Sequence, residues 1–211
     1  MVASAVLFDM DGVLIRSEEA WLRVLEDAGR RFRGSPVTRE EFAPTFGQGT
    51  AEDVRVFGLR CTPAELDAFY LEHLPAHASG VWINPDAHAL LESLAARGLR
   101  RAVVTNTVTP LARALLGAAR LLDFFEVLAC ADLVAHAKPA PDLVLYALGR
   151  LGLPPEAAVM VGDSRFDRGA AGAAGVRFVG LGLDGDARIE RLGELLPLLP
   201  LTTGPASPGA R

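Results

Sequence analysis

Two acidic residues follow the first apolar run of the chain at a spacing that suits chemistry. Asp9 and Asp11 come directly after residues 5–8, which are all hydrophobic. Because side chains alternate between the two faces of an extended strand, residues two apart point the same way. Paired carboxylates can act as a nucleophile and a proton donor, and their oxygens suit a hard cation such as Mg²⁺. The alternative is that residues 9–12 form only a turn that ends the strand.

Polar groups also follow three later apolar runs. They are Thr105 and Asn106, then Lys138, then Asp163 and Asp167. The carboxyl ends of parallel strands meet at one edge of an open α/β sheet, where ligands bind. A hydroxyl and backbone amides there could face an anion, and a lysine in a proline-stiffened loop could neutralise one. Each residue alone could be a helix cap or a surface charge, but complementary groups at four successive strand ends favour a shared site.

Lys138 is the only lysine of the chain. The other 20 of its 21 basic residues are arginines. An ammonium is a compact charge on a flexible stem, whereas a guanidinium is planar and forked. A position that keeps lysine is therefore expected to need the smaller group, although chance could also leave a single lysine.

A parallel sheet would bring these side chains together. From residue 84 onward, helix and strand patterns alternate, with strands predicted at residues 101–105, within 124–129, at 157–161 and at 176–179, and helices at 84–98, from 109, at 141–151 and at 167–174. Such alternation predicts an α/β fold with right-handed crossovers. Residues 17–79 show no clear strand, and helix starts are predicted there at Ser17, at Thr38 with Glu41, at Thr50 with Asp53, and at Thr62 with Glu65. We therefore expect a small all-helical unit inserted after the first strand.

Composition limits the classes of protein that the chain can belong to. Its length of 211 residues predicts one sizeable domain with room for a small insertion. Half of the residues are hydrophobic, and the net charge is −5. The lack of a basic tract argues against nucleic acid or an anionic membrane as partner, and no apolar stretch could span a bilayer. Two cysteines and no convincing signal peptide predict a cytoplasmic protein. The sequence leaves the oligomeric state open between a monomer and a homodimer. Residues 201–211 are expected to be disordered.

The order and spacing of the motifs resemble those of the haloacid dehalogenase (HAD) superfamily. The resemblance rests on Asp9-Met10-Asp11-Gly12-Val13-Leu14, Thr105-Asn106, Lys138-Pro139, and Gly162-Asp163 with Asp167, and it covers nearly the whole chain. Within the superfamily the chain is most similar to the phosphoglycolate-phosphatase and β-phosphoglucomutase-like branch. The resemblance implies a Rossmann-like parallel-sheet core formed by residues 1–16 and 80–200, with a helical cap at residues 17–79.

The resemblance also implies a role for each residue of the site. Asp9 would attack the phosphorus of a phosphomonoester, and Asp11 would protonate the leaving alkoxide and then take a proton from the hydrolytic water. The transferring phosphoryl oxygens would be held by Thr105, the backbone amide at Asn106, and Lys138.

Mg²⁺ is the cofactor that the resemblance implies. Its ligands would be the Asp9 carboxylate, the backbone carbonyl at Asp11, and Asp163, with Asp167 fixing a water or Lys138. Four carboxylates and one lysine leave a site of about −3, and a charge pair at about 4 Å costs about 4 kcal/mol at an effective dielectric of about 20. A divalent cation would let a phosphate dianion approach this acidic site.

Two segments depart from the pattern of the branch. Arg16 precedes Ser17 where relatives commonly carry an aspartate, and it could either contact an anionic part of the substrate or face solvent. Residues 46–50 of the expected cap carry no charge, whereas mutases use basic residues there to hold a second phosphate. This favours a phosphatase of a small phosphorylated metabolite over the alternative, a β-phosphoglucomutase-like mutase. A non-catalytic binding protein is disfavoured because every expected catalytic position is filled.

Overall fold

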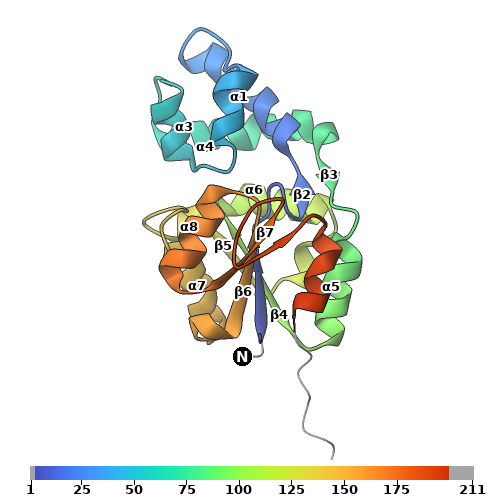
Figure 1. Cartoon of the computed structure of the whole chain (residues 1–211). Coiled ribbons are helices and arrows are strands. Elements are labelled where there is room, and N and C mark those ends of the chain that lie inside the picture. Colours follow the sequence, from blue (N-terminus) through green and yellow to red (C-terminus); the bar gives the residue numbers. More distant parts are fainter. Residues whose placement is uncertain (1–2, 200–211) are drawn as a thin grey trace, which may run out of the picture.

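The computed structural model describes residues 3–199, and residues 78–80 by their backbone alone. A helical cap lies above a larger α/β core (Figure 1). Residues 201–211, predicted to be disordered, lie outside the described residues.

The core is built on a six-stranded parallel sheet with the order β5-β4-β1-β6-β7-β8. The strands are β1 (Ala5–Phe8), β4 (Arg100–Thr105), β5 (Val127–Cys130), β6 (Ala158–Gly162), β7 (Arg177–Leu181) and β8 (Ala187–Ile189). The predicted α/β fold with a parallel, Rossmann-like sheet is confirmed. Because β1 lies between β4 and β6, residues that follow these three strands leave the sheet side by side.

Helices cover both faces of the sheet (Figure 1). They are α5 (Ala87–Ala96), α6 (Thr109–Ala118), α7 (Asp142–Leu151), α8 (Arg165–Ala174) and the short α9 (Leu195–Leu198). Alternate residues of β1 serve the two faces: Val6 and Phe8 belong to one buried apolar cluster, and Ala5 and Leu7 to the other. A strand buried on both sides is continuously hydrophobic, which explains the apolar run before Asp9.

The described residues of the cap form helices joined by loops and turns, without a strand. Its elements are α1 (Glu18–Phe32), α2 (Arg39–Phe42), α3 (Thr50–Val56), α4 (Pro63–His73) and two 3₁₀ segments, Ala43–Thr45 and Leu74–Gly80. The capping boxes predicted at Thr38 and Thr62 are present. The predicted pairing of Thr50 with Asp53 is wrong, because Gly49 is the N-cap and both side chains have other partners.

A short antiparallel ribbon joins the cap to the core. It consists of β2 (Ile15–Arg16) and β3 (Trp82–Ile83), with Ile15 opposite Ile83 and Arg16 opposite Trp82. This ribbon was not predicted from the sequence, because two-residue strands are too short to show a period. The division of the chain at residues 17 and 79 stays a prediction.

Other differences concern the ends of elements. The helix predicted at residues 84–98 is shorter, since Asn84 instead donates its side-chain amide to the Val13 carbonyl. Helix α8 begins at Arg165 rather than at residue 167, because Ser164 caps it. Strand β8 and helix α9 were not predicted. Among the described residues, no helix combines the length and apolar character needed to cross a bilayer.

Candidate active site

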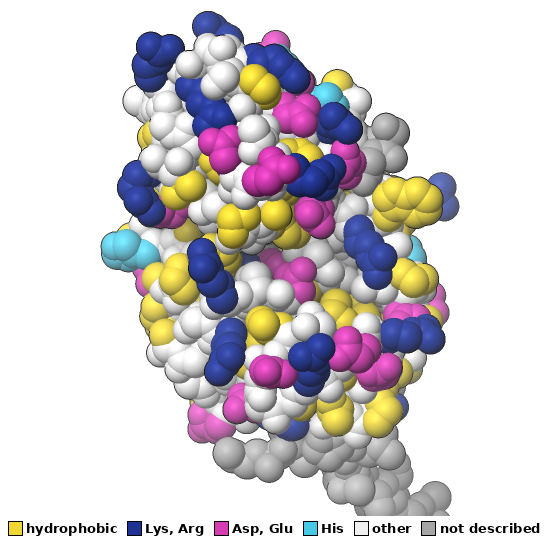
Figure 2. Space-filling view, turned by 45° about the horizontal axis from the view of Figure 1, so that its top comes forward, with side chains coloured by type: hydrophobic (Ala, Val, Ile, Leu, Met, Phe, Trp, Pro, Cys, Tyr) yellow, Lys and Arg dark blue, Asp and Glu magenta, His cyan; other side chains and the backbone are white. Residues whose placement is uncertain are grey.

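A cavity opens between the cap and the carboxyl ends of the central strands. Its volume is about 50 Å³, and both the core and the cap helices line it. Five of the predicted site residues line this cavity, namely Asp9, Asp11, Thr105, Asn106 and Lys138. Figure 2 shows a hollow between the two parts, with acidic side chains inside it and basic side chains on its rim.

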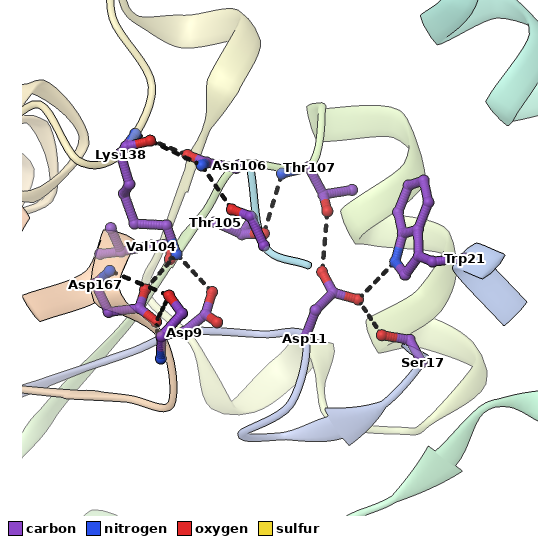
Figure 3. A network of polar contacts seen from close by, with 12 residues as sticks. Asp9, Asp11, Ser17, Trp21, Val104, Thr105, Asn106, Thr107, Lys138 and Asp167 are labelled. Carbon is purple, nitrogen blue, oxygen red and sulfur yellow. Dashed lines mark hydrogen bonds and ion pairs between the residues drawn. The ribbon is translucent and has the colours of Figure 1, made fainter. Parts of the chain in front are cut away.

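Lys138 joins two of the predicted acids in a buried ion cluster (Figure 3). Its Nζ donates to Asp9 Oδ1 at 2.6 Å, to Asp167 Oδ1 at 2.7 Å and to the Val104 carbonyl at 2.9 Å. The three side chains are at most 6% exposed. A single ammonium therefore uses all three of its donors, which a planar guanidinium could not match at these positions.

The charges in this cluster do not balance. Burial raises the pKa of Asp9 well above its ordinary value, and Asp167 raises it further against the opposing effect of Lys138. Burial disfavours the charged form of Lys138, but the two carboxylates outweigh it and keep the pKa of this lysine above its usual value. The site thus holds more negative charge than Lys138 can neutralise.

Asp163 adds a third carboxylate beside Asp9 and Asp167. Oxygen atoms of these three acids lie within 4.8 Å of one another. Burial, and next Asp167, raise the pKa of Asp163 to about 7. Three clustered carboxylates with surplus negative charge are the donor set that a hard cation such as Mg²⁺ prefers. The residues present therefore fit the predicted metal.

Two glycines make room for these acids. Gly12 has a φ of +93°, and a Cβ there would lie 1.9 Å from Oδ2 of Asp163. A Cβ on Gly162 would lie 2.3 Å from Cβ of Asp167. Each glycine thus allows an acidic side chain to approach the backbone more closely than any other residue would.

Asp167 has both carboxylate oxygens occupied. Its Oδ1 accepts from Lys138, and its Oδ2 accepts from the backbone N–H of Ser164 at 3.0 Å and from the Ser164 hydroxyl at 2.5 Å. In return the Ser164 hydroxyl caps helix α8. The capping box therefore fixes the carboxylate that holds Lys138.

Asp11 turns its carboxylate away from this acidic cluster and toward the cap (Figure 3). Oδ1 accepts from the Ser17 hydroxyl and from Trp21 Nε1, the latter at 2.9 Å. Oδ2 accepts from the Thr107 hydroxyl at 3.0 Å. The metal ligand predicted at Asp11 is its backbone carbonyl, so the position of its side-chain carboxylate is compatible with that prediction.

The residues after β4 connect the lysine loop and the cap. The Asn106 side chain donates to the Lys138 carbonyl at 3.1 Å and accepts from the Lys138 amide at 2.8 Å. The same Nδ2 donates to the Gly47 carbonyl of the cap at 2.9 Å. Thr105 Oγ1 accepts from the Thr107 amide at 3.1 Å, so its hydroxyl proton can be donated to a ligand.

Several residues of the site were missed or misread from the sequence. The sequence did not reveal that Ser17, Trp21 and Thr107 contact the Asp11 carboxylate. The cap also contributes Gln48, Asp53 and Tyr70 to the cavity wall. Thr107 lies 96 residues from Asp11, so no local pattern could reveal that contact. Ser17 and Trp21 are close to Asp11 in the sequence, but no regular strand or helix spacing relates them to it.

Arg16 is exposed in the ribbon opposite Trp82. It is not among the described residues that line the cavity. Of the two positions expected for Arg16, the structure therefore agrees with the solvent-facing one and not with a substrate contact.

Comparison with known proteins agrees with this geometry. Residues 6–181 match the model of the family described as Haloacid dehalogenase-like hydrolase. A phosphoglycolate phosphatase from Rhodospirillum rubrum is 35% identical over 191 residues, which cover 83% of this chain and 78% of the relative. A probable phosphatase, IndB, from Dickeya dadantii is 32% identical over 184 residues, covering 83% of this chain and 80% of the relative.

A solved structure gives the same result. The crystal structure of CbbY from Rhodobacter sphaeroides in complex with phosphate matches this chain with a TM-score of 0.83 at 28% identity, and the match covers 94% of this chain and 99% of that one. The chain belongs to the haloacid dehalogenase-like hydrolase family, as the motifs predicted, and relatives within that family carry the name phosphatase.

Proposed function

We propose that this hydrolase is a Mg²⁺-dependent phosphatase that acts on a small phosphorylated metabolite through an aspartyl-phosphate intermediate. The observation that carries the proposal is the buried contact of Lys138 with Asp9 at the carboxyl ends of the central parallel strands. It supports a carboxylate nucleophile next to a fixed positive charge, where a phosphoryl group could be held.

Asp9 is the proposed nucleophile. Its carboxylate oxygen would attack phosphorus, and the bond from phosphorus to the ester oxygen would break. Thr105, the amide of Asn106 and Lys138 line the same cavity and could donate to the phosphoryl oxygens. Positioning and charge neutralisation of this kind account for most of the catalysis in phosphoryl transfer.

Asp11 is the proposed acid and base. It lies two residues from Asp9 and faces the cap, where the leaving group would extend. A proton from its carboxyl group would go to the departing alkoxide. The resulting carboxylate would then take a proton from water, whose oxygen attacks the aspartyl phosphate and releases inorganic phosphate and free Asp9.

Asp9 and Asp163 would hold Mg²⁺ together with the backbone carbonyl at Asp11, and Asp167 would keep Lys138 in place. When bound, the cation would neutralise charge on the phosphoryl group and on the surrounding carboxylates. Without it, a doubly negative ester would face more acids than Lys138 can offset.

A small metabolite is the proposed substrate because the cap covers the reacting residues. Helix α1 of the cap reaches Asp11 through Trp21, and Gly47 of the cap contacts Asn106. A lid so close to the nucleophile would exclude macromolecular substrates from the cavity. The cytoplasm is the proposed location, and a monomer or homodimer the proposed state.

The test is release of inorganic phosphate from a panel of phosphorylated metabolites and 4-nitrophenyl phosphate, with Mg²⁺. We expect turnover by the wild-type protein, and loss of at least about a thousandfold in the Asp9→Asn variant, because the amide is a poor nucleophile. Equal turnover by this variant, or by wild-type protein after chelation of divalent ions, would contradict the proposal. Isomerisation of a sugar phosphate without phosphate release would instead indicate the mutase.

A further inference from the structure

The cap side of the cavity differs from its core side in chemistry. Apolar side chains from the cap and from α6 form part of the wall, namely Leu25, Phe42, Phe46 and Leu111. The same wall also contains polar groups of the cap, including Gln48, Asp53 and Tyr70. If Asp11 protonates the leaving alkoxide, the rest of the leaving group must lie against this wall.

Positive charge is scarce in this cavity. Among the described residues that line it, Lys138 is the single cationic side chain. Its ammonium is already shared by Asp9 and Asp167. The wall also contains Asp53 and Asp67, so the cap adds negative and no positive charge there.

Two hydrogen bonds hold the Asp53 side chain in place within this wall. Its Oδ1 accepts from Gln48 Nε2 at 2.7 Å, and its Oδ2 accepts from the Tyr70 hydroxyl at 2.8 Å. Burial raises the pKa of Asp53 to about 7, although Gln48 and Tyr70 oppose the increase. Ionised, this group repels an anion, and in its neutral form it adds no positive charge. Asp67 in turn accepts from the Thr50 hydroxyl at 2.7 Å.

The basic residues nearby line an outer groove that adjoins the cavity and shares Gln48, Asp67 and Lys138 with it. Arg55, His136 and Arg165 line that groove, which does not include Asp9 or Asp11. Arg55 pairs with Glu52, and His136 with Asp142 at 3.0 Å. None of the three lines the cavity that contains Asp9 and Asp11, so they add no positive charge to its wall.

We propose that the cavity selects phosphomonoesters whose alcohol carries no second negative charge. The inference rests on the proposed function and narrows its substrate class. A neutral or cationic alcohol can contact the apolar wall and the Gln48–Asp53–Tyr70 cluster. A carboxylate or second phosphate on the alcohol would be desolvated beside Asp53 and Asp67 with no cation to pair with.

The test uses three esters of similar size that differ in the charge of the leaving group. These are 2-phosphoglycolate, 2-hydroxyethyl phosphate and phosphoethanolamine, whose alcohols carry a negative, no and a positive charge. We expect kcat/KM for the anionic ester to be lower than for both others by at least about tenfold. A preference for 2-phosphoglycolate would overturn the inference and leave the phosphatase intact. If none of the three and no 4-nitrophenyl phosphate is hydrolysed, the proposed function fails and the inference fails with it.

A charge-removing variant locates the effect. Asp53→Asn keeps the shape of the side chain and should raise the ratio of kcat/KM for 2-phosphoglycolate over 2-hydroxyethyl phosphate by about threefold to tenfold. Glu72→Gln is the matched control, since Glu72 is an exposed acid of the same cap that lines neither cavity. Equal ratios in both variants would contradict the inference. Should Asp53→Asn fail to fold, Asp67→Asn tests the same charge at a half-buried position.

Discussion

The indole Nε1 of Trp21 donates a 2.9 Å hydrogen bond to Oδ1 of Asp11, and so ties the first helix of the cap to the proposed acid of the core. The indole also packs edge-on against Tyr70, with ring centroids 5.2 Å apart. The same tryptophan thus touches both the reacting carboxylate and the wall against which the leaving group would lie. This contact couples the position of the cap to the position of Asp11.

Replacing Trp21 with phenylalanine should lower kcat more than it changes KM. The variant keeps an aromatic ring against Tyr70 but removes the donor to Asp11, and a hydrogen bond to a charged group contributes about 1.5–3 kcal/mol. We expect kcat to fall about tenfold or more. Steady-state kinetics with a good ester would measure this. Trp82→Phe serves as the control because Trp82 is 71% exposed, and equal rates in both variants would count against a role for the bond.

Replacing Lys138 with methionine should destabilise the protein as well as inactivate it. Asp9 and Asp167 would lose their buried counter-charge, and removing one partner of a buried ion pair costs about 3–5 kcal/mol. Urea unfolding without Mg²⁺ should show this loss, and Asp167→Asn in the same chain should restore part of it. Lys138→Arg is expected to stay inactive, since three acceptors surround a single ammonium. Wild-type activity of this arginine variant would refute the need for an ammonium.

Mg²⁺ should raise the melting temperature of the wild-type protein. A ligand that binds only the folded state at about 100 times its Kd stabilises it by about 2.7 kcal/mol, or roughly 5–10 °C for a chain of this size. Asp163→Asn should abolish most of the increase, because it removes one of the three clustered carboxylates. Asp184→Asn, at an exposed acid paired with Arg188, should leave it unchanged. A shift that survives Asp163→Asn would place the cation elsewhere.

Asp53 should make the stability of the cap depend on pH. Its pKa rises from an ordinary 3.8 to about 7 in the folded protein, mainly through burial, with Asp67 and Glu52 adding to the increase. The folded state therefore holds this proton more tightly than the unfolded state. The contribution of the Asp53 proton to the free energy of unfolding is fully present below about pH 4. It falls as the pH rises toward about 7, by up to about 4 kcal/mol.

The Asp53→Asn variant isolates this effect. Asparagine does not ionise, so its free energy of unfolding relative to wild type should increase between pH 4 and pH 8. Urea denaturation at several pH values would measure the difference. A difference that stays constant over this range would show that Asp53 does not ionise on unfolding.

Local patterns in the chain were enough to predict the core strands β1, β4, β5, β6 and β7, but not β8. An apolar run followed by Asp9 and Asp11 marks the end of a buried strand, and Thr38 and Thr62 mark two helix starts, because each feature involves residues a few positions apart. The predicted pairing of Thr50 with Asp53 had the same spacing but was wrong. There the tertiary contacts to Asp67, Gln48 and Tyr70 outweigh the local cap.

The amino-acid sequence by itself determined the family, the order of the strands along the chain and the acids and lysine that meet at the sheet edge. Only the tertiary structure decided which of them touch. Thr107 reaches Asp11 across 96 residues of sequence, and Lys138 reaches Asp9 across 129. The cap wall of Gln48, Asp53 and Tyr70 also arises only when helices pack. Spacing carries no information on such contacts, because side-chain partners from distant segments are chosen by packing and burial.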